Sequence, residues 1–491
     1  MDNQRNILAI LLVGIIIMLT PYYLTLFEPV DNDSVNNEPV NNPYNFSSED
    51  TLSQFKKDVS FSVDDKHIKT SKKKTLHIDT PLYFASISNQ FGGSIYYYKL
   101  KLFDGGFNSL ENYQSNINSI LIDDDLTMCR PCLNVFHGQT GKSFPIDVFF
   151  NSNYIDNDTL FISPNSRDSL FFDVITNDFT MEKTIVFSGD SYLINNRINY
   201  SPAIFHYSDL LEISWQGGLR PTEKIESEDV QYGAVAFKVG DDVERFYHTS
   251  KDEVKNISIN GKIDWFAIKT KYFTSAVMPY TDTRSSNYSF ISRPFGFREI
   301  TPTYSAGIYF PFSNDFTFNV DLYLGPLDYA SLLSLDVGLE NAMDHGWSII
   351  RPFSKLVLGS LTFMHKYISN YGIVLILFAF LIRILTGPLT KKAALSSQKM
   401  QKIQPKIKKL QKKYKGDPQK LNQETIGLYK KHGVNPLGGC LPVLIQMPLL
   451  IALFTVFRNT IEFRGEPFFG WIVDLSQPDV IFNLPFSLPL Y

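Results

Sequence analysis

An apolar run over residues 371–389 is the feature that most constrains how this chain folds. About 20 apolar residues are enough for a helix to cross a bilayer, and the only charged residue in this run is Arg383. A charged side chain at bilayer depth costs about 2.5–3.5 kcal/mol on insertion scales and usually faces a wet cavity or a partner. Alternatively, Arg383 extends to the cytoplasmic headgroups, because Lys391 and Lys392 follow closely. The run by itself does not distinguish these two interpretations.

Two further stretches, residues 7–27 and 437–457, are apolar enough to span. The first ends in Pro21 and aromatic residues instead of the small residues that precede signal-peptide cleavage, which favours an uncleaved anchor. The second contains Pro442 and Pro448, which membrane helices tolerate when neighbouring groups satisfy the freed backbone.

Lysines are concentrated in one block. The chain carries a net charge of −4, yet residues 391–432 hold thirteen lysines against Asp417 and Glu424, which gives this block +11 and leaves −15 for the rest. Because cytoplasmic loops of membrane proteins are rich in Lys and Arg, we expect this block and the N-terminus in the cytoplasm and the large region after the first span outside. The block itself is either a solvated face near anionic lipids or a docking surface for acidic proteins or ribosomal RNA.

Apolar residues within the block recur at helical spacing, which predicts an amphipathic helix. This stripe consists of Met400, Ile403, Ile407, Leu410 and Tyr414. A break at residues 415–418 and a second helix over 419–431 then predict an antiparallel hairpin. The lysines expected to dock a partner are Lys399, Lys402, Lys406, Lys408, Lys409, Lys412 and Lys413.

Upstream of the apolar run, residues 347–366 carry apolar side chains at helical spacing with basic residues between them. This pattern predicts an amphipathic helix in the outer membrane interface, with a core helix of the outer domain as the alternative.

The region between the first two spans has the pattern of an all-β domain. Residues 31–50 are polar and Pro-containing, typical of a disordered tether. Short β-type runs follow, for example at 94–103, 184–187 and 264–272, with turn clusters at 105–106 and 256–261. Many short strands between turns predict a β-sandwich, and helix signals appear only at 327–343.

Nothing in the chain predicts enzymatic chemistry. Cys129 and Cys132 form C-R-P-C, which could be a redox pair or half a zinc site. No second pair is present and His137 does not complete a tetrahedral set, so a local disulfide or two free thiols are expected. The other histidines show no ligand spacing, and no acid pair, Ser-His-Asp set or phosphate-binding loop is found. We therefore expect no enzymatic activity, cofactor or metal.

Several motifs resemble those of the YidC family of membrane protein insertases, in its Gram-negative form with a large periplasmic domain. They are R-I-L-T-G-P-L-T-K at 383–391, K-M-Q-K-I-Q-P-K-I at 399–407, V-N-P-L-G-G-C-L-P-V-L-I-Q-M-P at 434–448 and F-F-G-W-I-V-D-L-S at 468–476. The stretches N-Q-F-G-G-S-I, D-W-F-A-I-K-T-K-Y-F-T-S-A-V-M-P and Y-L-G-P are similar to the periplasmic domain.

The resemblance implies a galactose-mutarotase-like periplasmic β-supersandwich joined to an α-helical transmembrane core with a cytoplasmic helical hairpin. Such proteins insert segments of nascent membrane proteins into the inner membrane, alone or with the Sec translocon. The core encloses a hydrophilic groove, in which Arg383 would attract acidic residues of the substrate. Gln446 and Thr386 would add polar groups, and Met447 an adaptable apolar contact. The lysine hairpin would contact the ribosome, signal-recognition-particle pathway components and anionic lipids.

The resemblance also sets the expected domains. They are an N-terminal anchor (1–27), a disordered linker (28–72), the periplasmic domain (73–346), an interfacial helix (347–366), transmembrane helix 2 (367–390), the cytoplasmic hairpin (391–433), transmembrane helix 3 (434–459) and a periplasmic segment (460–491).

Two departures from the family pattern stand out. The family core has five spans, or six with the anchor, whereas three are found here, so the helices that close the groove are expected to be missing from this sequence. Ala379 and Phe380, one turn before Arg383, offer it no polar partner.

The sequence is also compatible with two other functions. One is a membrane-anchored periplasmic carbohydrate-binding or carbohydrate-active protein, because the supersandwich resembles a sugar-epimerase fold and fold alone does not fix function. The other is a sensor whose basic hairpin is the cytoplasmic output.

Overall fold

The computed structural model describes residues 71–102, 119–123, 128–137, 142–204, 209–223, 226–247, 255–260, 262–280, 287–293, 303–311, 316–347, 349–433 and 441–477. The expected span at 7–27, the tether at 31–50 and the turn at 105–106 lie outside the described residues. The chain divides into two compact units, with the boundary between Gly325 and Pro326.

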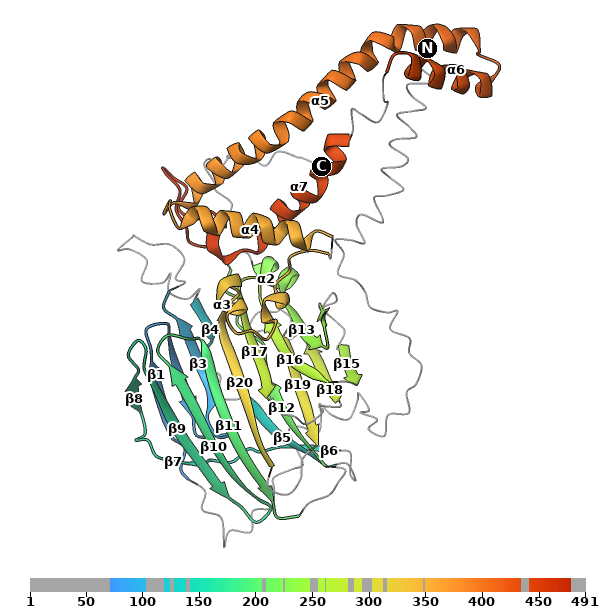
Figure 1. Ribbon diagram of the computed structural model, residues 1–491. Coiled ribbons are helices and arrows are strands. Elements are labelled where there is room, and N and C mark those ends of the chain that lie inside the picture. Colours follow the sequence, from blue (N-terminus) through green and yellow to red (C-terminus); the bar gives the residue numbers. More distant parts are fainter. Residues whose placement is uncertain are drawn as a thin grey trace, which may run out of the picture. The chain divides into compact units, whose positions relative to one another are not determined.

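The first unit consists mainly of three β-sheets (Figure 1). The nine-stranded sheet has the order β14-β13-β16-β17-β20-β11-β10-β9-β7, the six-stranded sheet β15-β18-β19-β12-β5-β6 and the five-stranded sheet β4-β3-β2-β1-β8. The strands are β1 (Thr75–Asp79), β2 (Tyr83–Ser88), β3 (Ser94–Leu100), β4 (Ile120–Ile122), β5 (Cys132–His137), β6 (Lys142–Pro145), β7 (Asn151–Ser152), β8 (Asp158–Phe161), β9 (Arg167–Ile175), β10 (Phe179–Ser188), β11 (Leu193–Pro202), β12 (Leu210–Trp215), β13 (Ala234–Val239), β14 (Asp242–Phe246), β15 (Lys255–Asn260), β16 (Ile263–Lys269), β17 (Phe273–Tyr280), β18 (Asn287–Arg293), β19 (Thr303–Pro311) and β20 (Phe316–Pro326).

The smaller sheets both pack on the nine-stranded sheet. Phe310 of β19 stacks on Phe318 of β20, with ring centroids 6.1 Å apart. On the five-stranded side, the Tyr98 hydroxyl of β3 donates a 2.8 Å hydrogen bond to the carbonyl of Leu324 in β20. Sheets joined face to face through aromatic side chains form a sandwich, so the predicted β-sandwich is confirmed.

Alternation of side chains decides which face of each strand is buried. In β10, alternate residues from Phe179 to Phe187 are buried, whereas Thr180 and Glu182 are exposed. Successive side chains of a strand point to opposite faces, so one face of β10 belongs to the core.

The structure differs from two expectations for this region and its C-terminal flank: one expected turn is a strand, and helix also occurs outside residues 327–343. Residues 256–261 were expected to be a turn, but β15 covers most of them and pairs with β18, because N-I-S-I alternates polar and β-branched residues. A helix not expected within the β region, α2 (Glu226–Tyr232), precedes β13. The helix signals at 327–343 yield only α3 (Tyr329–Leu333) and η2 (Leu339–Ala342), which Gly338 in a left-handed conformation separates.

The second unit is helical and contains α3, η2, α4 (Arg351–His365), α5 (Tyr371–Lys413), α6 (Pro418–Lys431), α7 (Leu441–Asn459) and η4 (Ile461–Phe463). The expected span at 371–389 and the expected basic helix after it form a single helix, α5, although Pro388 and Pro405 lie inside it. Each proline leaves one carbonyl of the preceding turn without its helical partner. The helix continues nevertheless because the residues after Pro388 are mainly Lys, Gln, Leu and Ala, which favour helix.

Candidate functional site

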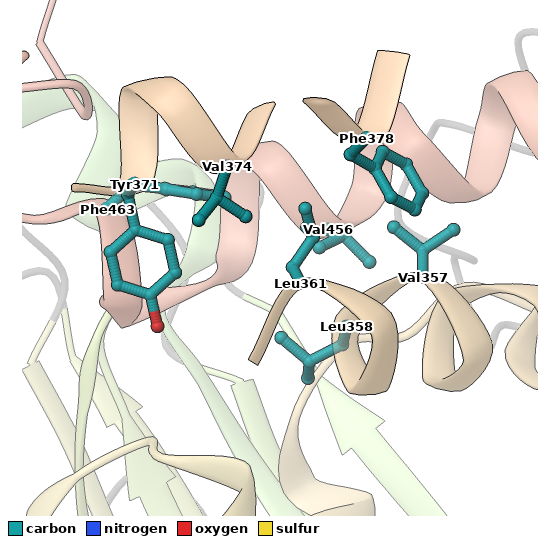
Figure 2. Close-up of a cluster of buried hydrophobic side chains, with 8 residues drawn as sticks. All are labelled: Val357, Leu358, Leu361, Tyr371, Val374, Phe378, Val456 and Phe463. Atoms are coloured by element: carbon teal, nitrogen blue, oxygen red, sulfur yellow. The ribbon is translucent and has the colours of Figure 1, made fainter. Parts of the chain in front are cut away.

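The first turns of α5 are anchored by a buried apolar cluster. Figure 2 shows side chains of α4, α5, α7 and η4 converging there. The cluster consists of Val357, Leu358, Leu361, Tyr371, Val374, Phe378, Val456 and Phe463. Leu375 and Ile382 of α5 and Leu449 and Leu453 of α7 pack against it while remaining partly exposed. The helix α5 is therefore held at its N-terminal end.

Asn370 fixes where α5 begins. Its side-chain oxygen accepts a 3.1 Å hydrogen bond from the backbone N–H of Ile373, as an N-cap does. This residue is not among those predicted from the sequence, although an Asn directly before an apolar run is a recognised helix-start signal.

From Ile373 onward, α5 also presents apolar side chains to the surface. Ile384 is 71% exposed and Leu385 is 65% exposed. Within the described part of the chain, α5 is the helix long and apolar enough to cross a membrane. Exposed apolar patches of this kind mark sites that lipid or another protein covers.

Arg383 lies within this exposed region. Its side chain is exposed, and no hydrogen bond or ion pair joins it to another described residue. It follows Ile382 directly, so it lies about 100° around the helix axis from that packing residue. The guanidinium thus has its five N–H donors available for a group outside the described residues.

Thr386 and Gln446 do not pair with Arg383. The Thr386 hydroxyl donates a 2.8 Å hydrogen bond to the carbonyl of Ile382, one turn back in the same helix. Gln446 of α7 is exposed and forms no hydrogen bond to Arg383 within the described residues. Met447 beside it is 38% exposed. The predicted groove residues therefore lie on two helices that both contribute to the buried cluster. Within the described residues, their side chains form no hydrogen bond or ion pair with one another.

The basic hairpin is formed by the end of α5 and by α6. Asp417 caps α6 by accepting a 3.0 Å hydrogen bond from the Lys420 backbone N–H. Tyr414 packs between two lysines, with its ring 5.2 Å from Lys413 Nζ and 5.7 Å from Lys420 Nζ. Ile403 is the most buried member of the predicted apolar stripe, at 4% exposed.

Most of the lysines predicted to dock a partner are solvent-exposed on this hairpin. Lys399, Lys402, Lys406, Lys409, Lys412 and Lys413 are exposed, and Lys408 is half-buried. Lys406 Nζ lies 2.8 Å from His432 Nε2, which accepts from the ammonium when the imidazole is neutral there. The exposed face is strongly basic, since α6 adds Lys430 and Lys431 in its last turn.

The β unit offers little that could act as a catalytic centre. Cys129 and Cys132 form a disulfide, one of the two states expected for C-R-P-C. His137 Nδ1 lies 3.0 Å from the buried carboxylate of Asp209. No group of three or more His, Cys, Asp or Glu side chains suited to a metal ion occurs among the described residues.

Two family models match the chain, and the first extends past Gly325, where the first unit ends. The family model for the YidC periplasmic domain matches residues 170–356, and that described as 60Kd inner membrane protein matches residues 363–491. The β unit is similar in outline to a galactose mutarotase-related enzyme from Lactobacillus acidophilus, at 10% identity over 50% of this chain and 96% of that one, with a TM-score of 0.30. A putative aldose 1-epimerase from Escherichia coli K12 gives 8% identity over 52% and 99%, with a TM-score of 0.29.

Curated relatives cover most of the chain. A membrane protein insertase YidC of Prosthecochloris aestuarii is 33% identical over 433 residues, which is 86% of this chain and 70% of the relative. That of Chloroherpeton thalassium is 30% identical over 86% of this chain and 71% of its own length. The YidC of Chlorobaculum parvum is 38% identical over 64% of this chain, but the match spans only about half (54%) of that relative. The relatives of this chain are membrane insertases rather than enzymes. The chain belongs to the YidC family of membrane protein insertases.

Proposed function

We propose that this chain inserts hydrophobic segments of nascent proteins into the inner membrane, and that Arg383 lies in a hydrophilic groove that receives them. The observation that carries the proposal is Arg383, which lies exposed between the exposed apolar side chains of Phe380 and Ile384 and has no ion pair or hydrogen bond to another described residue. An unpaired charge at bilayer depth is costly unless water or a transient partner accompanies it. An incoming segment with an acidic flank supplies such a partner, because a guanidinium binds carboxylates in a bidentate manner.

The proposed topology places α5 across the membrane with its N-terminus outside. The basic hairpin then lies in the cytoplasm, in agreement with the positive-inside rule. The helix α7 has 19 residues and so is about 29 Å long, close to the roughly 30 Å of the hydrocarbon core. We assign it as a second span, and the β unit and residues 460–491 as periplasmic.

The hairpin is proposed to recruit substrate at the cytoplasmic face. Its exposed lysines suit anionic partners, namely ribosomal RNA, acidic surfaces of signal-recognition-particle pathway components and anionic lipid headgroups. We also propose that the chain cooperates with the Sec translocon, as the family resemblance implies. A carbohydrate-active role has no support from the described residues beyond the outline of the β unit.

Depletion and complementation in cells tests the function. Arg383→Ala is expected to reduce insertion of small substrates with acidic flanks at least about tenfold, the equivalent of about 1.4 kcal/mol. Arg383→Lys should retain only part of the insertion, because it keeps the charge but loses the bidentate contact. Substrates with neutral flanks serve as the internal comparison and should depend less on Arg383. Normal insertion of every substrate by Arg383→Ala would rule out the groove charge, and failure of the unmodified, intact gene to complement would rule out the function.

A further inference from the structure

Residues 468–473, called the aromatic tip below, expose three large apolar side chains close together in sequence. Phe469 is 67% exposed, Trp471 61% and Val473 66%. None of the six residues of the tip carries a charge. Apolar side chains gathered at such exposure mark a surface that another phase or molecule covers.

The tip is a structured loop. The backbone N–H of Phe468 donates to the carbonyl of Ile472 at 3.1 Å, and Leu475 N–H donates to the carbonyl of Glu466 at 3.0 Å. Below it, the buried carboxylate of Asp474 accepts from the backbone N–H groups of Gly465 at 3.0 Å and Ser476 at 2.8 Å. The exposed side chains are therefore held in place by the backbone that carries them.

The aromatic tip is also fixed beside the start of α5. The Asn370 side-chain N–H₂ group donates to the carbonyls of Pro467 and Phe468, at 3.2 Å each, while its oxygen caps α5. The Phe468 ring packs against the backbone of Gly372, in space that a β-carbon at that position would fill. The exposed apolar surface of α5 begins with the next residue, Ile373, at 45% exposed.

We propose that the aromatic tip inserts into the headgroup boundary of the outer leaflet and sets the depth of the outer end of α5. This inference rests on the proposed function in one respect, that α5 crosses the membrane with its N-terminus outside. Trp and Phe favour the interfacial zone, where an apolar ring meets lipid chains and the indole N–H meets headgroups. The tip lies beside the first turn of α5, and in the proposed topology this turn lies where the span enters the interfacial zone of the outer leaflet.

Tryptophan fluorescence with brominated lipids tests the inference. The chain has four tryptophans. Trp215 and Trp265 are buried in the β unit. The substitution Trp347→Phe removes the fluorescence of the third, so that quenching can be assigned to Trp471. The protein carrying Trp347→Phe is reconstituted in phosphatidylcholine–phosphatidylglycerol vesicles brominated either near the headgroups or near the chain ends. At an interfacial depth of about 5–10 Å, shallow bromines should quench Trp471 at least about twofold more than deep ones. Adding Trp471→Phe should remove the quenched emission.

The span has its own control. Leu377→Trp, placed in the protein lacking Trp347 and Trp471, should be quenched more by deep bromines than Trp471 is. If Leu377→Trp is quenched and Trp471 is not, the tip does not enter lipid and the inference is wrong, while the span stands. If neither is quenched, both the inference and the proposed topology fail.

The clamp is tested by Asn370→Asp, which keeps an oxygen to cap α5 but loses the N–H₂ donor to Pro467 and Phe468. Trp471 should then be quenched less selectively by shallow bromines, because the tip is no longer held at one depth. Unchanged depth selectivity would show that Asn370 does not position the tip. Asn422→Asp, an exposed Asn of α6, is the matched control and should change nothing.

Discussion

The imidazole of His365 stacks on the ring of Tyr371, with ring centroids 3.7 Å apart and planes inclined by 8°. The stack joins the last residue of α4 to the first residue of α5. His365 Nδ1 is buried without a hydrogen-bond partner among the described residues, and the stacked ring contributes packing at this position. The contact fixes how the proposed interfacial helix meets the proposed span.

Replacing His365 separates the contribution of the ring from that of its nitrogen atoms. His365→Ala is expected to destabilise the junction of α4 and α5 by about 0.5–1.5 kcal/mol beyond the loss of buried area, the usual worth of an aromatic pair. His365→Phe should retain the stack and match or exceed the unmodified protein. Amide hydrogen exchange in the last turn of α4 measures both, and equal protection in all three proteins would contradict a role for the stack.

The buried carboxyl group of Glu462 should make the stability of the helical unit depend on pH. Burial raises the pKa of its carboxyl to about 7, and one of its oxygens has no hydrogen-bond partner within the described residues. The folded state therefore holds a proton that the unfolded state releases near its ordinary pKa of about 4.3. Stability falls as pH rises from about 4.3 to about 7 and is lowest, and constant, above that range.

Glu462→Gln should remove this dependence. We expect the variant to be more stable than the unmodified protein by up to about 3 kcal/mol at pH 8 and nearly equal to it at pH 4.5. Thermal unfolding of the detergent-solubilised protein at the two pH values measures the difference. Glu424→Gln, at an exposed position of α6, should leave the pH profile unchanged, and an equal gain at both pH values would refute the titration.

Lys183 should give the stability of the β unit the opposite dependence on pH. It lies on the buried face of β10 at 1% exposed, opposite Phe172 of β9 and Ile198 of β11. Its ammonium has no hydrogen-bond partner among the described residues, and burial lowers its pKa to about 7. The unfolded chain holds this proton up to about pH 10.4. The β unit therefore gains stability as pH rises from about 7 to about 10, and the destabilisation caused by Lys183 is largest below pH 7.

Lys183→Met tests this because it keeps the length of the side chain and removes the charge. It should stabilise the β unit by on the order of 3 kcal/mol at pH 7 and by much less at pH 10. Trp215 and Trp265 are buried in this unit, so urea unfolding followed by their fluorescence gives the measurement. Lys262→Met, at an exposed lysine, is the control. A stability gain that does not change with pH would mean that the pKa of Lys183 is the same in the folded and unfolded chain, and that the gain comes from packing alone.

The sequence predicts best what depends on local pattern. The apolar run of α5, the stripe around Ile403 and the β-sandwich follow from periodicity, because periodicity decides which face of a helix or strand is buried. Lys183 had a local signal too: it occupies the inward position of F-T-M-E-K-T-I-V-F, and the sequence analysis recognised only the end of that strand. The clamp from Asn370 to Pro467 joins residues 97 apart, which no local pattern reports. Pairing of Arg383 with Thr386 could not be excluded from sequence, because the choice of the Thr386 hydroxyl for its own helix depends on geometry.

Gly93 explains why the N-Q-F-G-G-S-I motif needs its second glycine. The residue has φ of 93°, and a β-carbon there would lie 2.5 Å from Cδ1 of Ile185 on the nine-stranded sheet. Two separate costs therefore oppose a side chain: a left-handed backbone, about 1–2 kcal/mol, and overpacking of the core, about 1–3 kcal/mol. Gly93→Ala is expected to destabilise the β unit by about 2–5 kcal/mol in total.

Gly240 provides a control that separates these costs. Its φ of 62° is also left-handed, but nothing lies within 4 Å of the position that a β-carbon would take. Gly240→Ala should therefore show the backbone cost alone, about 1–2 kcal/mol. Urea unfolding followed by tryptophan fluorescence compares the two variants. Equal losses would mean that Ile185 moves aside without cost and that the motif reflects backbone conformation only. A larger loss for Gly93→Ala assigns the excess to the contact of residue 93 with Ile185 of β10.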